Sequence, residues 1–177
     1  MVRSIQSLLC LTVIGACFVI SCGQTPQAKL INEVNAAWIK ARELGDEAER
    51  RRAQAREKSA SGDHAEHDKL IQEAADLYQQ AADSLNGASD KTHELAKQKQ
   101  PKWYEEYFSL QSKLMRNLAQ LAVGAHDELL ARMRGAPSES QVQFWNENIT
   151  RIRKENDELW TQIKTIEKRE GLVLIKE

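Results

Sequence analysis

The chain has 177 residues, and its 25 Lys and Arg balance 26 Asp and Glu to give a formal net charge of -1. This balance gives no electrostatic reason to expect nucleic-acid binding. Charged residues make up 29% of the chain, which has only 8 Gly and 3 Pro, a composition typical of long helices rather than of a β-sandwich, a β-barrel or a disordered polymer. All 3 Cys lie in the first 22 residues, which excludes a fold held together by disulfides.

The first 22 residues have the layout of a secretory signal. Arg3 supplies a positive start, and residues 4–21 are mostly apolar, as in a signal peptide that is removed from the mature protein. The sequence Val19-Ile20-Ser21-Cys22 resembles the lipobox of bacterial lipoproteins. This resemblance covers residues 1–22 only. It implies that residues 1–21 are cleaved off and that Cys22 carries a diacylglycerol, often with a further acyl chain such as palmitate on the freed amine.

Two other interpretations of this leader stay open. Ile14-Gly15-Ala16-Cys17 also fits the lipobox pattern, and residues 4–21 could instead remain as an uncleaved anchor at the lower length limit for a membrane span. In all three cases we expect the rest of the chain to lie outside the cytoplasm, attached to a membrane of a bacterial cell envelope. Gly23 after Cys22 resembles the outer-membrane sorting choice of Gram-negative lipoproteins, which would place the domain on the periplasmic face of that membrane.

Heptad patterns in the remaining chain predict an all-α fold, an elongated up-down-up-down four-helix bundle or antiparallel coiled coil. We expect a lipidated Cys22 with a short tether over 22–29, a bundle over 30–171 and a short apolar tail over 172–177. The predicted helices are 26–60, 63–99, 101–134 and 138–170. The third helix has the widest apolar face, so we expect it to be the most buried.

The clearest heptad is in the last predicted helix, where apolar residues and one Asn recur at spacings of three and four: Val142, Trp145, Ile149, Ile152, Asn156, Leu159, Ile163 and Ile166. Asn156 either fixes the register of the core or occupies a solvated seam position. In the second helix, Asn86-Gly87 is a turn signal, yet the heptad phase continues across it. We therefore predict a continuous or locally kinked helix there, with a break into five helices as the alternative.

The predicted topology brings the start of the third helix and the C-terminal tail back to the anchored end. Trp103, Tyr104, Leu172 and Ile175 are candidate membrane contacts at this end, because interfacial aromatics and apolar residues near lysines suit a headgroup region. The alternative is that the aromatic residues belong to the core and the tail packs on the bundle.

Residues with potential binding chemistry are sparse. His64 and His67 lie three apart beside Asp63, and imidazole with carboxylate suits Zn, Ni or Cu. They are weak metal candidates, because polar residues also collect at helix starts as caps. We expect no metal, no cofactor besides the covalent lipid on Cys22, and no catalytic residue.

Arg50, Arg51 and Arg52 form the strongest basic run of the chain. Interspersed Glu47 and Glu49 favour a solvated helix face with internal ion pairs. A partner protein or a polyanion distant from the membrane is the functional alternative.

These features together predict a lipid-anchored envelope protein with a non-enzymatic interaction or structural role. Its expected partners are the membrane, through the anchor, and an envelope protein or a second copy of the chain. The alternative is a ligand-binding or holding-chaperone bundle with an apolar cleft between its helices, and a metal-binding bundle is the weakest candidate.

Overall fold

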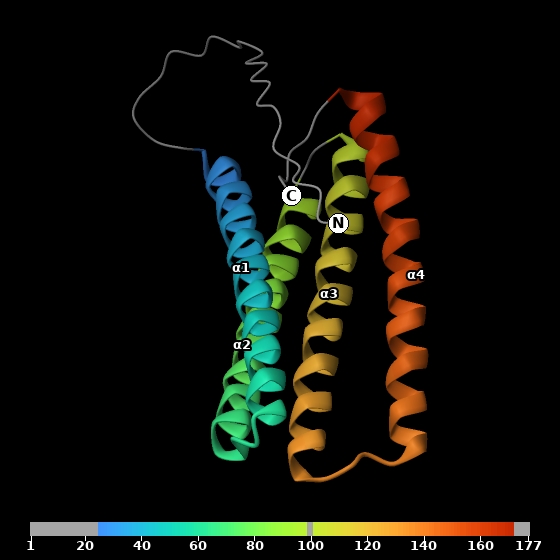
Figure 1. Cartoon of the computed structure of the whole chain (residues 1–177). Coiled ribbons are helices and arrows are strands. Elements are labelled where there is room, and N and C mark those ends of the chain that lie inside the picture. The colour runs from blue at the N-terminus through green and yellow to red at the C-terminus, as the bar shows by residue number, and fades with distance from the viewer. Residues whose placement is uncertain (1–24, 99–100, 172–177) are drawn as a thin grey trace.

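The computed structural model describes residues 25–98 and 101–171. Its four helices are α1 (Pro26–Ala60), α2 (His64–Ala96), α3 (Lys102–Arg134) and α4 (Glu139–Glu170), which run alternately up and down (Figure 1). No strand occurs within these two described ranges. The all-α, up-down-up-down four-helix bundle is thus confirmed. The largest difference in a helix limit is at the end of the second helix, predicted at 99 and observed at Ala96.

Side-chain caps define where three of the helices begin. The Thr25 hydroxyl oxygen accepts a hydrogen bond from the Ala28 amide at 3.2 Å, and the Asp63 carboxylate accepts one from the Glu66 amide at 3.3 Å. Ser138 and Gln141 form a full capping box at the start of α4. These caps satisfy amide groups that the first helical turn leaves without partners.

Small residues let α1 and α2 pack closely along their length. The buried residues of α1 recur at every seventh position, as Val34, Ala41, Ala48 and Ala55. Alanines also supply much of the facing stripe on α2, including Ala74, Ala81 and Ala88. Asn86 and Gly87 are exposed within an uninterrupted α2, so the continuous-helix prediction is right and the five-helix alternative is wrong.

The prediction that the third helix is the most buried is wrong, because α2 has 12 buried residues, against 10 in α3. Each of the two helices contacts two neighbours, α2 between α1 and α3 and α3 between α2 and α4. Ser89 and Ser112 fasten α2 to α3, since each hydroxyl donates to the other residue's carbonyl oxygen, at 2.9 and 3.0 Å. The lower burial of α3 comes from its second half, where residues 121–126 are only partly covered.

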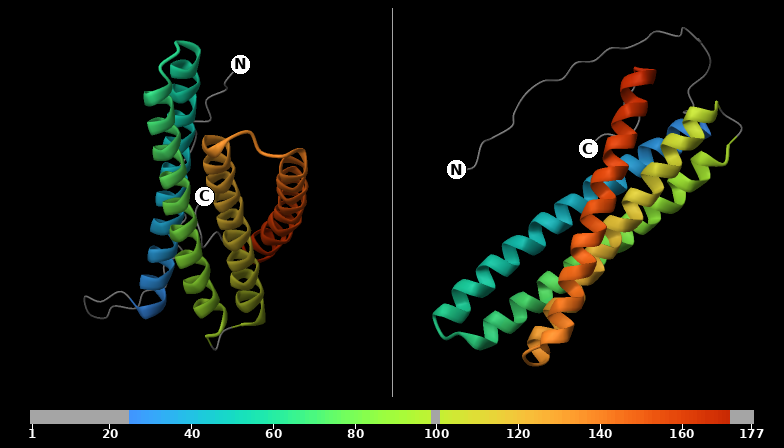
Figure 2. Two further views of the ribbon diagram at one scale, coloured as in Figure 1. Left: turned by 90° about the horizontal axis from the view of Figure 1, so that it is seen from below. Right: turned by 90° about the vertical axis from the view of Figure 1, so that its right-hand side faces the viewer.

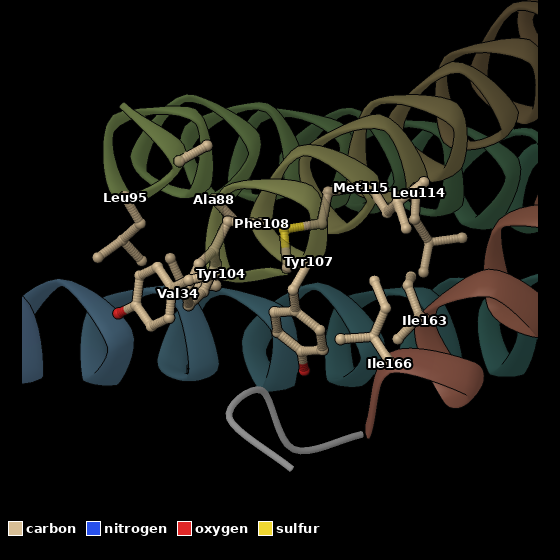
Figure 3. Packing of buried hydrophobic residues seen from close by; sticks show 12 residues of the cluster. Val34, Ala88, Leu95, Tyr104, Tyr107, Phe108, Leu114, Met115, Ile163 and Ile166 are labelled. Carbon is tan, nitrogen blue, oxygen red and sulfur yellow. The ribbon is translucent and has the colours of Figure 1, made fainter. Parts of the chain in front are cut away.

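The largest core cluster lies at the end where α1 and α3 begin and α2 and α4 end, here called the proximal end (Figure 3). Phe108, Leu114 and Ile163 are fully buried in it. The Tyr107 hydroxyl donates to the buried Glu167 carboxylate at 3.1 Å, which joins α3 to α4. Gln27 of α1 also hydrogen-bonds Tyr104 of α3, so three helices are tied together at this end.

α4 diverges from the other helices toward the opposite, distal end, whereas α2 and α3 stay packed there through Leu129, Ala74 and Tyr78 (Figure 2). The divergence is visible in the burial of α4. Ile152, Ile163 and Ile166 are buried, whereas Val142, Trp145 and Ile149 are only half-buried, although all six belong to one heptad stripe. The distal part of α4 therefore leaves an opening in the bundle. None of the four described helices combines the length and the apolar character needed to cross a membrane.

Candidate functional site: a cleft between the four helices

A cleft of about 520 Å³ lies between the four helices, where the distal part of α4 diverges. We call it the central cleft. Its apolar wall residues come from every helix: Trp38, Ala41, Gly45, Ala81, Leu85, Leu118, Leu121, Ala122, Ala125 and Ile149. The polar or charged residues that line it are Arg42, Glu49, Arg52, Tyr78, Glu128 and Arg153.

The cleft exists because small side chains face it from several sides. Ala41 and Gly45 of α1 and Ala122 and Ala125 of α3 fill little volume, and Ile149 of α4 does not close the remaining space. In a closed bundle such alanines and glycines would let α4 approach the other helices directly. Instead α4 makes close backbone contact mainly with α3.

A hydrogen-bonded network of Glu49, Arg52 and Tyr78 forms one polar part of the cleft wall. The Glu49 carboxylate accepts hydrogen bonds from the Tyr78 hydroxyl and, at 2.8 Å, from Arg52 Nη1. Burial, and the hydrogen bond that Tyr78 donates to Glu49, raise the pKa of the Tyr78 hydroxyl. Burial alone would lower the pKa of Arg52, but its contacts with Tyr78 and Glu49 outweigh that effect and raise it. The charges of Glu49 and Arg52 are thus matched within the protein.

Two further arginines of the cleft have no such match. Arg42 of α1 and Arg153 of α4 are exposed, and no carboxylate of the described residues forms an ion pair with either guanidinium. Glu128, the other acid of the lining, is paired with Arg132 at 2.8 Å. The unpaired charge of the central cleft is therefore positive, and it comes from two opposite walls.

Two aromatic rings mark the proximal limit of the cleft. Trp38 of α1 lies edge-to-face against Trp160 of α4, with ring centroids 6.4 Å apart, and Trp38 also lines the cleft. Asn156 lies two helical turns beyond Ile149 on the same stripe of α4 and is 7% exposed. Its Oδ1 has no hydrogen-bond donor among the residues described. Asn156 is therefore buried and the solvated-seam alternative is wrong, whereas its role in fixing the register stays a prediction.

The weak metal candidates lie at the distal α1–α2 turn, away from the cleft lining. Asp63 acts as the cap of α2 and lies 3.5 Å from Lys58 Nζ. His67 Nδ1 lies 2.9 Å from the Asp68 carboxylate, and His64 is exposed. Across residues 25–98 and 101–171, no three His, Cys, Asp or Glu side chains gather into a group that could hold a metal ion.

The candidate membrane contacts fall into two groups. Tyr104 is buried at 7% exposure, and Trp103 is half-buried with its ring edge-to-face against Tyr104 at 5.5 Å. For Tyr104 the structure thus favours the core alternative over membrane contact, because its ring packs on Phe108 and its hydroxyl bonds Gln27. Leu172, Ile175 and the lipidation candidate Cys22 lie outside the described residues.

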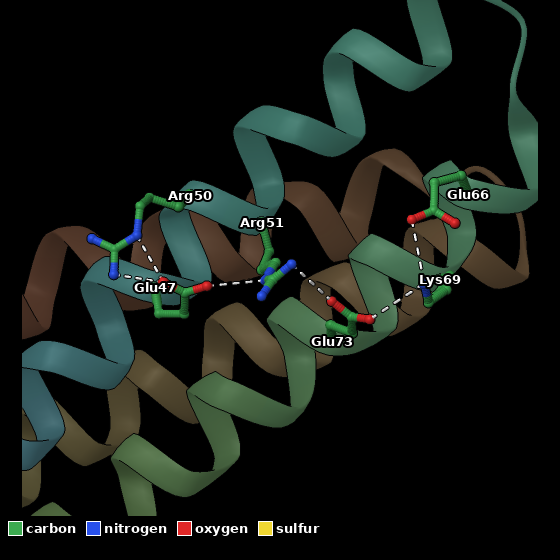
Figure 4. Close-up of polar contacts among 6 residues, drawn as sticks. All are labelled: Glu47, Arg50, Arg51, Glu66, Lys69 and Glu73. Atoms are coloured by element: carbon green, nitrogen blue, oxygen red, sulfur yellow. Dashed lines mark hydrogen bonds and ion pairs between the residues drawn. The ribbon is translucent and has the colours of Figure 1, made fainter.

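The arginines of the basic run of α1, Arg50 to Arg52, form ion pairs with carboxylates of α1 and α2 (Figure 4). Glu47 pairs with Arg50 at 2.5 Å and with Arg51 at 3.0 Å, and Arg51 also reaches Glu73 at 3.4 Å. The pairing with Arg50 lowers the pKa of Glu47. The solvated-face interpretation fits this arrangement, and only Arg52 of the three arginines lines the cleft.

Sequence patterns did not single out Arg42, Arg153 or Tyr78 as a group. Arg42 and Arg153 flank their apolar stripes as ordinary surface residues do, and Tyr78 occupies a heptad position. Only the three-dimensional structure brings them together, because all three line the cleft that the divergence of α4 leaves open. Comparisons of the chain with protein-family models, curated proteins and solved structures found no match.

Proposed function

We propose that this chain is a lipid-anchored, non-enzymatic binding protein of a bacterial cell envelope, which takes up an apolar ligand in the central cleft. The observation that carries the proposal is the cleft itself, whose volume of about 520 Å³ is within the range of small-molecule sites, about 300–1,000 Å³. A bundle with a purely structural role has no need for such an opening. The cleft thus favours the ligand-binding alternative over a structural role.

The lining of the cleft suits non-covalent binding of an apolar ligand rather than catalysis. Leu85, Leu118 and Ile149 offer hydrophobic surface that an apolar ligand would remove from water, at about 25 cal/mol per Å² of buried apolar area. The polar groups of the wall are either paired, as in Glu49 with Arg52, or exposed arginines that remain charged. Neither kind is an activated nucleophile or a general base, which supports a binding role rather than catalysis.

The anchor part of the proposal rests on the leader sequence. Acylation of Cys22 would attach the chain to a membrane a few residues before α1 begins at Pro26. Trp38, at the proximal limit of the cleft, lies 12 residues into α1, or roughly 18 Å along the helix axis. A ligand could then reach the cleft from the aqueous side of the envelope.

Two measurements test the two parts. For the anchor, the mass of the protein purified from a lipoprotein-processing bacterium should equal residues 22–177 plus lipid, and Cys22→Ala should abolish both cleavage and lipid addition. An unprocessed chain with Cys22 intact would refute the lipoprotein assignment.

For the cleft, an uncharged apolar fluorescent probe should bind the wild-type protein, and Ala122→Phe should abolish binding by filling the cleft. Ala53→Phe is the matched control, because Ala53 is exposed on α1 and does not line the cleft. Absence of probe binding to the wild type, or its persistence in Ala122→Phe, would refute the cleft as the binding site.

A second candidate function is protein interaction through the distal end, as favoured by its apolar exposure. Phe144 is 63% exposed and Met133 is 36% exposed, at the start of α4 and the end of α3. Crosslinking in intact cells, followed by affinity purification, would recover an envelope partner or a second copy if this surface binds protein. Phe144→Ser should remove that partner, and recovery unchanged by the substitution would argue against this surface.

A further inference from the structure

The shape and charge of the central cleft together identify a class of ligand, an inference that rests on the proposed binding function. The α1 residues that line the cleft extend from Trp38 to Arg52, or about 21 Å along the helix. Its volume of about 520 Å³ lies within the range of small-molecule sites, about 300–1,000 Å³. An elongated site of this size suits a single flexible chain.

The wall chemistry fits the body of such a chain. The lining includes Ala41 and Ala81 on the α1–α2 side, and Leu121 and Ala122 on α3. These side chains offer apolar contact without directional polar groups, which is what an alkyl chain requires. In the polar part of the wall, Glu49, Arg52 and Tyr78 hydrogen-bond one another. Binding at these residues therefore does not require a polar group on the ligand.

The charge at the cleft points to the other end of the ligand. Arg42 and Arg153 contribute two guanidinium groups from opposite walls, with no carboxylate of the described chain paired to either. Guanidinium groups bind carboxylate and phosphate oxygens through paired, charge-assisted hydrogen bonds. An acidic head would therefore be neutralised at the cleft, whereas an amine head would meet two like charges.

We propose that the central cleft binds one single-chain anionic amphiphile, with its alkyl chain along the apolar wall and its acidic head at Arg42 and Arg153. Fatty acids are the simplest members of this class. The binding is reversible and involves no covalent step.

A competition experiment with three heads on one chain tests the inference directly. The purified full chain, in nonionic detergent, is incubated with equimolar hexadecanoic acid, hexadecanol and hexadecylamine, and native mass spectrometry reads which of them stays bound. We expect the acid to be favoured over the alcohol by about tenfold, the ratio that 1.4 kcal/mol of preference gives. The amine should be the weakest of the three.

Charge-removing variants assign the preference to the two arginines. The double variant Arg42→Gln/Arg153→Gln should bring acid and alcohol to within about twofold of each other, since the loss of both guanidinium groups removes the charge-assisted hydrogen bonds. The control Arg56→Gln/Lys154→Gln removes the same charge from exposed positions of α1 and α4 outside the cleft lining, and should keep the tenfold preference. All four positions are exposed, so circular dichroism should confirm that both variants stay folded.

Each outcome decides one of the two proposals. Equal binding of acid and alcohol, both abolished by Ala122→Phe, would overturn the anionic-ligand inference and leave the proposed binding function standing. An acid preference that survives Arg42→Gln/Arg153→Gln would also overturn the inference. Binding of none of the three would refute the inference and, together with a failure of the uncharged probe to bind, the binding function itself.

Discussion

Two isoleucines of α4 provide a direct test of the contrast between the closed proximal core and the open distal cleft. Ile163 and Ile149 lie two heptads apart on the same stripe, yet Ile163 is fully buried and Ile149 is half-buried beside the cleft. Replacing Ile by Ala removes three methyl or methylene groups, worth about 0.8 kcal/mol each when buried. At Ile163 this gives about 2.4 kcal/mol, and the cavity left behind raises the expected loss to about 3–4 kcal/mol.

At Ile149 the same substitution removes groups that are only partly shielded from water and enlarges a cleft that is already open. We therefore expect Ile149→Ala to lower the free energy of unfolding by about 1 kcal/mol, roughly half the transfer term with no new closed cavity. Urea unfolding followed by circular dichroism measures both variants against the wild type. Equal losses for Ile149→Ala and Ile163→Ala would refute the reasoning, because they would mean that the distal core is as tightly packed as the proximal one.

Three further substitutions or titrations address the polar groups of the core. Ser112→Ala should lower the free energy of unfolding by about 1 kcal/mol, since it removes the buried bond from the Ser112 hydroxyl to the Ser89 carbonyl oxygen and keeps the bond from the Ser89 hydroxyl to the Ser112 carbonyl oxygen; the exposed Ser59→Ala is the control, and a loss no larger than the control's would contradict the role of this pair. Asn156→Leu should raise stability by about 1 kcal/mol, because it removes a buried carbonyl oxygen that has no donor in the described chain; a loss instead would reveal a partner for that oxygen. The raised pKa of Tyr78 means that its contribution to stability is fully present below about pH 10 and is lost as the pH rises through the raised value. Ultraviolet titration of tyrosinate should show a late-ionising component to which both Tyr78 and Tyr104 contribute, and Tyr78→Phe should reduce it by one tyrosine. An unchanged titration curve in that variant would contradict the assignment.

The helices were predictable from the sequence because each one carries its own signals. Pro26 after Thr25, Gly62 before Asp63, and Ser138 with Gln141 mark helix limits through local backbone chemistry. The alanine stripe of α2 likewise predicted close packing of a neighbouring helix, because heptad spacing fixes which residues share a face. Local rules of this kind act within a few residues, so one sequence suffices to apply them.

The cleft could not be predicted in the same way. In the sequence, Val142, Trp145 and Ile149 look as ready for a core as Ile152, Ile163 and Ile166 do. Whether a stripe is covered depends on the angle at which its helix crosses the others, and that angle follows from side chains on other helices. The prediction that the third helix is the most buried was wrong for the same reason. Its apolar face is wide, but its second half faces the cleft.

The charges around the cleft offer a physical reason why the distal part of α4 stays apart from α1. Closing the gap would bring Arg42 and Arg153 toward a shared, less hydrated space without a carboxylate to pair with them. Removing unpaired charges from water is unfavourable by several kcal/mol per ion, more than the small apolar residues Ala41 and Gly45 would regain on contact with α4. At the proximal end the balance is reversed, because Tyr107 and Lys164 both reach the buried Glu167 carboxylate. The same two arginines that oppose closure are those that the proposed acidic ligand would neutralise, so under that proposal one feature would both keep the cleft open and select its ligand.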